Sequence, residues 1–450
     1  MKLLLMRSTC LLRLHIQKTF YGTYKRTTQP KMGKLITSTV NTPEFYSLFN
    51  PNLISLINLF KKYNYELRIA GGAVRDLLTG KKPEDIDFAT TATPEQMKDI
   101  FTKENIRMIN LKGESHGTVT ARINDCENYE ITTLRIDIKT DGRHAKVEFT
   151  QDWHQDAGRR DLTINAMFLD FNGILYDYFN GRKDLEERRV CFVGEPATRI
   201  QEDYIRILRY FRFWGRISSQ NGLHNPEALK AIEENAVGLS DIAGERIWVE
   251  MKKIITGPNF TSVIATMAKL GVLKHIGYAE NVNIEEMDQV WKRMKGFSML
   301  PMTLMSTLMY DSQDVMKLNQ KMKMSNEEMN LLNFIVEERY KISEENIIKH
   351  YKDMVLSGRD SKLKGRILEL LKYLGEEDLL TEFNEWIPPK FPVSGYDLMK
   401  QNIPKGPIFN QTLNFLKDVW KESDYILTKE ELLRLGEKFV SGSESKTKLL

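Results

Sequence analysis

The chain has 450 residues, of which 41% are hydrophobic and 28% are charged, and its formal net charge at pH 7 is +4. This length exceeds what one ordinary hydrophobic core supports, so we expect several domains. The charge is too small for a chain that coats nucleic acid along its whole length. The sequence also contains no run of about 18 uncharged apolar residues, which a membrane-spanning helix would need. The three cysteines, Cys10, Cys126 and Cys191, lack the spacing of a zinc site, which favours a reducing compartment.

The first 34 residues carry eight Lys and Arg residues, and the first acidic residue of the chain is Glu44. Basic, acid-free sequence with interspersed Leu, Phe, Ser and Thr is typical of a mitochondrial targeting segment, and a basic disordered start is the alternative. We therefore predict a targeting segment at residues 1–34 and a location in the mitochondrial matrix. Met32 offers a second start, which predicts a shorter cytoplasmic or nuclear form.

Between residues 35 and 180, short runs rich in β-formers alternate with short helical stretches, and the clearest runs are YELRIAGG, GTVTARI, YEITTLRIDI and GILYDYF. After Gly181 the apolar residues recur at steps of three and four, which predicts helices. The sequence thus predicts an α+β fold, with a small mixed-sheet head followed by an all-helical neck, body and tail. The predicted bounds are 35–180 for the head, 181–260 for the neck, 261–387 for the body, 388–440 for the tail and 441–450 for a disordered terminus.

A Gly-Gly pair joins a predicted strand to a predicted helix in RIAGGAVRDLL. Gly71 and Gly72 would let the backbone N–H groups at the helix start approach a phosphate closely, and Arg75 lies one turn further on. Taken alone, such a turn is more often structural than functional.

Two carboxylates follow in PEDIDFAT. In an extended strand Asp85 and Asp87 would share one face while Ile86 and Phe88 face the other, and Glu130 on the strand EITTLRI would complete a trio if the two strands were neighbours. Carboxylates that close repel each other unless a cation lies between them, and oxygen ligands suit Mg²⁺. Such a site would assist attack by a hydroxyl on a phosphate and stabilise released pyrophosphate. A solvated acidic loop is the alternative.

A predicted helix over EDYIRILRYFRF places charged residues at steps of three and four among aromatic ones. Because the interleaved aromatic residues predict a buried helix, its arginines need anionic or polar partners, and phosphates and base edges would serve. An ordinary surface helix with salt bridges is the alternative. The charged positions are Glu202, Asp203, Arg206, Arg209 and Arg212.

GGAVRD and DID resemble the polymerase-β-type nucleotidyltransferase superfamily, and RRDLTINAM at 159–167 with EDYIRILRYFRF at 202–213 resembles its class II CCA-adding enzymes. The resemblance is dense over about residues 60–260. It implies that Asp85, Asp87 and Glu130 are catalytic, with Asp85 and Asp87 as magnesium ligands. It also implies that Gly71, Gly72 and Arg75 bind nucleotide, that Asp203 and Arg206 select its base, and that Arg160, Arg209 and Arg212 hold its triphosphate.

Hydrogen-bond donors and acceptors explain why an Asp and an Arg would suit that selection. Cytosine and adenine each present an amino donor beside a ring-nitrogen acceptor, whereas uracil and guanine present a carbonyl beside an N–H group. A carboxylate with a guanidinium therefore matches C and A only. Asp161 and Asn165 either lie near the sugar or brace the pocket, and Gly142, Arg143 and His144 lie in a hairpin loop or a mobile segment.

The resemblance implies an enzyme that adds CCA to the 3′ end of tRNA from CTP and ATP, without a nucleic-acid template. It also implies contacts with the acceptor and T arms of tRNA, for which a basic group in the body is a candidate, although each residue taken singly is more often solvated surface. This group comprises Lys352, Arg359, Lys362, Lys364 and Arg366. The alternatives are a poly(A) polymerase-like terminal transferase and a catalytically silent RNA-binding homologue.

Overall fold

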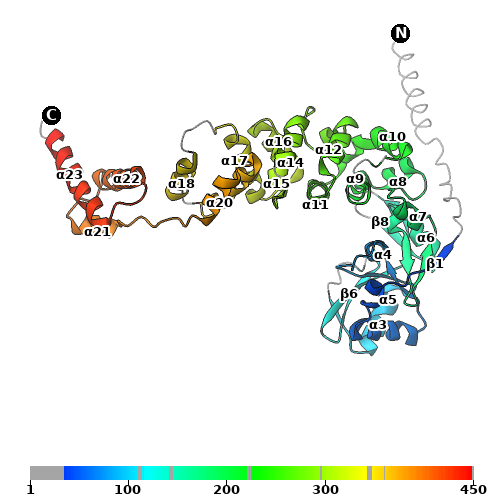
Figure 1. Cartoon of the computed structure of the whole chain (residues 1–450). Coiled ribbons are helices and arrows are strands. Elements are labelled where there is room, and N and C mark those ends of the chain that lie inside the picture. The colour runs from blue at the N-terminus through cyan, green and yellow to red at the C-terminus, as the bar shows by residue number, and fades with distance from the viewer. Residues whose placement is uncertain are drawn as a thin grey trace, which may run out of the picture. The chain divides into compact units, whose positions relative to one another are not determined.

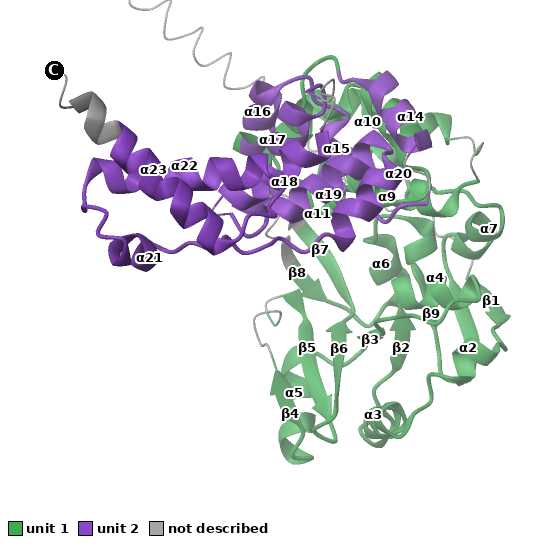
Figure 2. Ribbon diagram, turned by 60° about the vertical axis from the view of Figure 1, so that its left-hand side comes forward, with its two compact units in different colours: residues 1–281, 320–323 green, residues 282–319, 324–450 purple. Residues whose placement is uncertain are grey.

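The computed structural model describes residues 35–447, apart from residues 110–113, 115, 141–144, 220–221, 223, 294–295, 342–346 and 359. The predicted targeting segment and Met32 lie outside the described residues. The chain divides into two compact units, Met1–Asn281 with Gln320–Lys323, and Val282–Asn319 with Met324–Leu450 (Figure 2). The first unit continues about twenty residues past the predicted end of the neck at 260.

An eight-stranded mixed sheet forms the head, with the strand order β1-β10-β9-β2-β3-β6-β5-β4 (Figures 1 and 2). Every neighbouring pair is antiparallel except β3 with β6, which is parallel. A separate hairpin pairs β7 with β8. The strands are β1 (Ile36–Thr39), β2 (Leu67–Ala70), β3 (Asp87–Thr90), β4 (Arg107–Ile109), β5 (Thr118–Ile123), β6 (Glu127–Thr133), β7 (Arg135–Thr140), β8 (Ala145–Phe149), β9 (Met167–Leu169) and β10 (Ile174–Asp177). The predicted α+β class is confirmed.

One face of the sheet carries the main core of the head. Side chains from α2 (Pro43–Tyr46), α3 (Pro51–Lys62), α4 (Gly72–Leu78) and α5 (Pro94–Lys103) pack there against alternate strand residues, among them Ile69, Phe88 and Ile131. The sequence fixes the helix starts locally: Thr93 and Gln96 form a capping box at α5, with Pro94 as its first residue. The opposite face carries a smaller cluster with Trp153 and Ala157 of α6 (Trp153–Gly158).

Beyond Asp177, helices make up all the regular secondary structure in the described part of the chain. The first unit continues with α7 (Gly181–Glu186), α8 (Pro196–Glu202), α9 (Ile205–Ile217), α10 (Pro226–Asn235), the 3₁₀ helix η3 (Ala236–Asp241), α11 (Gly244–Ile255), α12 (Phe260–Lys269) and α13 (Val272–His275). A further 3₁₀ turn, η2 (Thr163–Asn165), lies earlier in the chain, between α6 and β9. Helix α11 packs against α9. None of the described helices is long and apolar enough to cross a lipid bilayer.

The second unit contains α14 (Ile284–Arg293), α15 (Pro301–Ser306), most of α16 (Ser312–Met322), α17 (Asn326–Glu338), α18 (Ile347–Ser357), α19 (Leu363–Leu374), α20 (Glu377–Glu385), α21 (Gly395–Lys400), α22 (Pro407–Glu422) and α23 (Lys429–Thr447). A separate apolar cluster around Leu398, Leu416 and Trp420 holds the last three helices together. Helix α23 extends to Thr447, which lies within the terminus predicted at 441–450, and residues 448–450 lie outside the described residues. Proline, the residue that most strongly ends a helix, is absent from this stretch.

A column of rings lies inside the helical part of the first unit. The imidazole of His224 stacks on Trp214 with 3.9 Å between ring centroids, and its Nδ1 lies 3.1 Å from the Tyr210 hydroxyl. Burial lowers the pKa of His224 from 6.5 to about 4. The folded protein therefore holds this imidazole neutral at pH values where an unfolded chain would protonate it.

We expect this histidine to make the protein less stable in mild acid. The unfolded chain takes up the proton below pH 6.5 and the folded chain only near pH 4, so stability is lost as pH falls between these values, by about 2 kcal/mol at pH 5. Urea unfolding followed by tryptophan fluorescence at pH 7.5 and pH 5 measures this loss. His224→Phe should flatten the pH dependence, and an identical slope in wild type and variant would contradict this account.

Candidate active site

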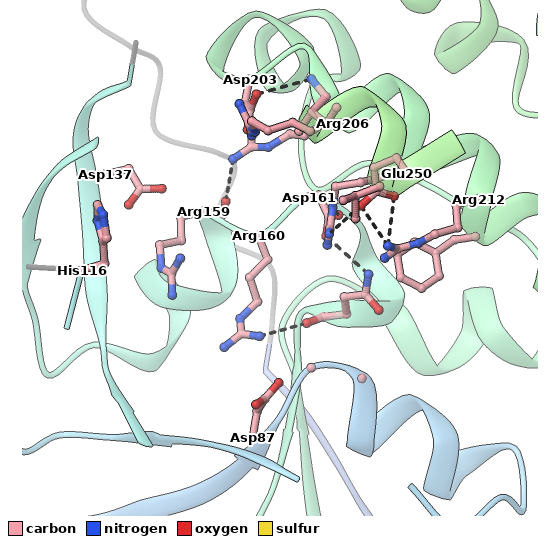
Figure 3. A pocket seen from close by; sticks show the side chains of 18 of the residues that line it. Asp87, His116, Asp137, Arg159, Arg160, Asp161, Asp203, Arg206, Arg212 and Glu250 are labelled. Atoms are coloured by element: carbon pink, nitrogen blue, oxygen red, sulfur yellow. Dashed lines mark hydrogen bonds and ion pairs between the residues drawn. The ribbon is translucent and has the colours of Figure 1, made fainter. Parts of the chain in front are cut away.

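A cavity of about 1200 Å³ lies within the first unit, and strands of the sheet, the loops beside α6, and α9 and α11 all contribute to its wall (Figure 3). Its described lining includes eight arginines and eight carboxylates. The arginines are Arg75, Arg135, Arg159, Arg160, Arg206, Arg209, Arg212 and Arg246, and the acids are Asp87, Glu130, Asp137, Asp161, Glu202, Asp203, Glu245 and Glu250. Twelve of the thirteen predicted site residues line this one cavity. Asp85 is the exception.

Asp87 and Glu130 lie side by side on the only parallel strand pair among the described strands. They are partners in the β3–β6 register, so both side chains leave the same face of the sheet. The flanking Phe88 and Ile131 turn into the core on the opposite face, where Ile86 also packs. The predicted alternation is present for Asp87 and Glu130 against Phe88 and Ile131, but it does not extend to Asp85, which precedes the strand.

Asp85 precedes the strand and lies in a bend, because β3 begins only at Asp87. Burial by the pocket wall raises the pKa of Asp87, the negative charges of Glu130 and Asp85 raise it further, and Arg160 opposes them. Asp85 is thus close enough to act on Asp87 electrostatically. This carboxylate group is short of positive charge, which fits a divalent cation held by hard oxygen ligands.

Among the described residues no group of three or more His, Cys, Asp or Glu side chains is arranged to hold a metal ion by protein ligands alone. Two or three carboxylates on one face suit Mg²⁺, which usually keeps several sites for water and substrate phosphate. The residues present therefore fit a cation that binds together with a nucleotide.

Gly71 and Gly72 form the turn from β2 into α4. Gly71 has φ = 66°, a left-handed conformation that favours glycine, and a Cβ atom there would lie 3.2 Å from the Arg160 guanidinium. Arg75 donates to the Asn165 side chain at 2.7 Å and to its neighbour Asp76 at 2.9 Å. The glycines therefore leave room for an arginine at the pocket floor.

Arg159 and Arg160 share one buried carboxylate. Asp156 accepts from Arg159 Nε at 2.8 Å and from Arg160 Nη2 at 3.1 Å. Burial favours protonation of Asp156, but Arg160 and Arg159 outweigh burial and hold its pKa below the usual value. Two guanidinium groups on one carboxylate leave a net positive charge, which favours an anion such as a phosphate at this point of the pocket.

Asp161 pairs with an arginine, as the bracing interpretation of this residue predicts. Its buried carboxylate accepts from Arg209 Nε at 2.5 Å, from Asn165 Nδ2 at 3.4 Å and from the backbone N–H of Leu162 at 2.9 Å. Arg209 outweighs the effect of burial and keeps the pKa of Asp161 low. These contacts tie α9 to the segment that follows α6.

Arg212 has a carboxylate partner that spacing along the chain did not predict. Its Nη1 donates to Glu250 Oε1 at 3.0 Å, and both side chains are buried. Burial lowers the pKa of Arg212 to about 10 even with Glu250 beside it, so the guanidinium stays charged at neutral pH. The pair joins α9 to α11 below the pocket.

The predicted helix over 202–213 is interrupted. Helix α8 ends at Glu202 and α9 begins at Ile205, and Asp203 between them has an extended backbone with φ = −159° and ψ = 106°. The Asp203 carboxylate accepts from the backbone N–H of Ile205 at 3.3 Å. Aspartate often satisfies free N–H groups at a helix start in this way, which explains the break. Asp203 and Arg206 therefore belong to different local structures.

Both side chains of this pair have supporting partners. Arg246 of α11 donates to Asp203 Oδ2 at 2.6 Å. Arg206 donates to the Glu202 carboxylate at 2.5 Å, to the Arg199 carbonyl at 2.9 Å and, through Nη2, to the Arg159 carbonyl at 3.2 Å. A guanidinium has five N–H donors and each carboxylate oxygen accepts twice, so both groups keep capacity for a ligand.

Figure 3 shows how the two ends of the pocket differ. Asp87 lies at one end and Asp203 with Arg206 at the other, and Arg159 and Arg160 lie between them. The order is thus carboxylate, arginine pair, Asp–Arg pair.

Sequence reasoning missed several lining residues. Arg159 stands in RRDLTINAM, and Arg246 and Glu250 stand in GERIWVE at 244–250, within the residues 60–260 that the resemblance covers, and that was the signal available for them. His116, Arg135 and Asp137 line the pocket from β7 and the turn before β5. Arg135 donates to the His116 carbonyl.

Two predictions concern residues away from this pocket wall. Strands β7 and β8 pair on either side of this segment, and Gly142, Arg143 and His144 themselves lie outside the described residues, so both alternatives for them stay open. In the body, Lys352 pairs with Glu382, Lys362 and Arg366 pair with Glu327, and Lys364 donates to the Trp386 carbonyl. Arg359 is not among the described residues. These bonds are intramolecular and do not decide between contact with tRNA and the alternative of solvated surface.

Comparisons with known proteins match the head and the helical part that follows it to two separate family models. The family model described as the poly A polymerase head domain matches residues 67–191. The model described as a probable RNA and SrmB-binding site of polymerase A matches residues 225–277. A solved structure of the Bacillus stearothermophilus CCA-adding enzyme in complex with CTP aligns with a TM-score of 0.69 and 24% identity, covering 91% of this chain and 100% of that chain. This likeness shows a shared fold.

Several relatives found by sequence have a higher identity to this chain than that solved structure has. CCA tRNA nucleotidyltransferase 1, mitochondrial, from Mus musculus is 54% identical over 403 residues, which cover 89% of this chain and 93% of the relative. The Homo sapiens protein of the same name is 53% identical with the same coverage. The CCA-adding enzyme of Bacillus licheniformis is 36% identical over 225 residues, which cover 50% of this chain and 54% of that enzyme.

The mixed sheet with its paired carboxylates, the arginine-lined pocket and the helical remainder define a nucleotidyltransferase of the polymerase-β type. Because the mouse and human relatives match more than half of the aligned residues over nearly their whole length, the chain belongs to the CCA tRNA nucleotidyltransferase family. The family expected from the sequence motifs is thereby confirmed.

Proposed function

We propose that this chain adds C, C and A to the 3′ end of tRNA without a nucleic-acid template, using CTP and ATP and releasing pyrophosphate. The observation that carries the proposal is one pocket in which Asp87 and Glu130, an arginine pair and the Asp203–Arg206 pair lie together. The names of the mouse and human relatives, which refer to CCA and tRNA, support the same activity.

In this proposal Asp87 and Asp85 hold Mg²⁺, and Glu130 completes the carboxylate group. When bound, the cation supplies positive charge to the reacting phosphate and lowers the cost of forming an attacking oxyanion from the tRNA 3′-hydroxyl. Glu130 lies beside Asp87 on the next strand, so it is placed to orient water or the hydroxyl. The attack on the α-phosphate forms a new phosphodiester bond and breaks the bond to pyrophosphate.

Gly71, Gly72, Arg75 and Arg160 would hold the triphosphate, because they line the pocket beside Asp87. Arg209 and Arg212 already bind Asp161 and Glu250, so for them the proposal requires donors shared between a carboxylate and a phosphate. We assign Asp161 and Asn165 mainly to bracing. Asp203 accepts from the amino group of C or A while Arg206 donates to the ring nitrogen, and Arg246 and Glu202 hold these two groups in place.

The experiment that tests this function uses a tRNA transcript that lacks its terminal CCA, with Mg²⁺, CTP and ATP, followed by sequencing of the product 3′ ends. We expect C, C and A and then no further growth. Long A tails would instead support a poly(A) polymerase-like transferase, for which the match to a poly A polymerase head domain leaves room. Unchanged RNA ends would indicate a silent RNA-binding homologue.

Contacts between the helical part and the acceptor and T arms of tRNA are a further part of the proposal, supported by the family model for an RNA-binding segment at 225–277. Recognition by shape and phosphate contacts would suit an enzyme that accepts every tRNA. Footprinting of full-length tRNA with and without the protein tests it, and protection confined to the anticodon arm would contradict it.

The mitochondrial relatives and the basic, acid-free residues 1–34 support a mitochondrial location. We propose in addition that starting at Met32 yields a cytoplasmic or nuclear form. Fluorescent fusions test this: the full chain should enter mitochondria and a chain starting at Met32 should not. Mitochondrial import of the shorter chain would contradict the prediction.

A further inference from the structure

Most residues of the pocket wall are polar or charged. Among the side chains that the structure describes there, three are hydrocarbon: Ile205, Phe213 and Val249. Ile205 and Phe213 are each only 6% exposed and belong to the packed interior of α9. Val249 is 49% exposed, which leaves a rigid, β-branched apolar surface open to the pocket beside charged neighbours.

The position of Val249 on α11 places it close to the base-selecting pair. Arg246 precedes Val249 by three residues, so both lie on the same face of the helix. The Arg246 guanidinium binds the Asp203 carboxylate at 2.6 Å. Glu250, the next residue along, faces Arg212 of α9, and this contact fixes α11 against α9. Val249 is therefore held about one helical turn from Arg246, whose guanidinium binds the Asp203 carboxylate that would read the base edge.

A nucleobase needs more than edge contacts. Hydrogen bonds to Asp203 and Arg206 would fix the base within its plane, but they leave its two flat faces to be covered by water or by protein. Base faces are apolar and gain from contact with a hydrocarbon or aromatic surface. At this end of the pocket Val249 is the exposed hydrocarbon among the described lining residues.

We propose that one face of the nucleobase of the bound CTP or ATP packs against Val249. This inference rests on the proposed function, because it takes Asp203 and Arg206 as the edge readers. It adds a nonpolar contact that carries no preference for one base edge, so it strengthens binding of both nucleotides and leaves discrimination to the polar pair. The larger face of adenine gains more from the contact than the face of cytosine.

Calorimetric titration of the full chain with ATP or with CTP in the presence of Mg²⁺, without RNA, tests the inference. Val249→Thr keeps the shape of the side chain but replaces one methyl group with a hydroxyl, and Val249→Ala removes both methyl groups. We expect the dissociation constant for ATP to rise by about 3- to 10-fold in both variants, and that for CTP by a smaller factor. The matched control is Val237→Thr, at a 62% exposed valine of the same unit that does not line the pocket.

Either of two calorimetric results would overturn the inference. One is unchanged dissociation constants for both nucleotides in both variants, and the other is an equal loss in Val237→Thr. Weaker binding of tRNA with unchanged nucleotide binding would also overturn it, because the base on Val249 would then belong to the RNA. Since the readout is binding without RNA, a wild-type protein that binds both nucleotides but does not extend tRNA would refute the proposed function and leave the Val249 contact measurable.

Discussion

Asp87→Asn is expected to lower the rate of nucleotide addition by at least about 10³-fold, equally with CTP and with ATP, because it removes a charged ligand from the site that stabilises the reacting phosphate. The substitution keeps the size of the side chain. It also removes a charge whose burial, together with repulsion from Glu130 and Asp85, raises the pKa of Asp87, so the fold should be no less stable. Single-turnover addition to a tRNA that lacks CCA measures the rate.

Two companion variants sharpen this first prediction. Glu84→Gln changes an exposed acid that directly precedes Asp85 and does not line the pocket, so it should leave the rate within about twofold of wild type. Asp85→Asn should also abolish addition if the residue before the strand turns toward the cation, whereas a rate near wild type would confine the cation ligands to Asp87 and Glu130. Full activity of Asp87→Asn would contradict the assigned chemistry.

Asp203→Ala is expected to reduce the preference for CTP and ATP over UTP and GTP by about 10²- to 10⁴-fold, because a site whose buried polar groups fit one base edge rejects the wrong base by leaving those groups unpaired. The same variant should slow addition of the correct nucleotide much less than Asp87→Asn does. Competition among the four nucleoside triphosphates on one tRNA measures the preference.

Arg246 supplies a second test of the same idea. Arg246→Ala leaves Asp203 in place but removes the donor at 2.6 Å that orients its carboxylate, so it should weaken base selection less than Asp203→Ala does. Arg246→Lys keeps the charge and should restore part of the selectivity. Unchanged selectivity for C and A in Asp203→Ala would refute the role assigned to this residue.

Local sequence patterns predicted the parts of the site that depend on local geometry. The alternation of acids with Ile86 and Phe88 placed the carboxylates on the outer face of a strand, and β3 has this arrangement from Asp87 onward. The Gly-Gly turn into a helix is where the sequence predicts it. The helix break at Asp203 had a local signal as well, because aspartate competes for backbone N–H groups, but the helical spacing of the arginines obscured it.

Partners that lie far apart in the chain could not be predicted by spacing. Asp161 and Arg209 are 48 residues apart, Asp203 and Arg246 are 43 apart, and Arg212 and Glu250 are 38 apart. Each pair forms because α9 packs against α11 and against the segment after α6, and helix packing of this kind leaves no periodic trace in the charged residues. The sequence carried no signal that half-exposed Val249 would line the pocket, because a single valine in a helix is normally assigned to the hydrophobic core.

The four-nucleotide experiment tests the central claim most directly when wild type, Asp87→Asn and Asp203→Ala are compared by kcat/KM for each of CTP, ATP, UTP and GTP on tRNA ending in CC and on tRNA lacking CCA. The account predicts that Asp87→Asn lowers all values and leaves their ratios unchanged, while Asp203→Ala brings the four values together with a small loss for the correct nucleotide. If Asp203→Ala lowered all four values in proportion, chemistry and base choice would not be divided between the two ends of the pocket.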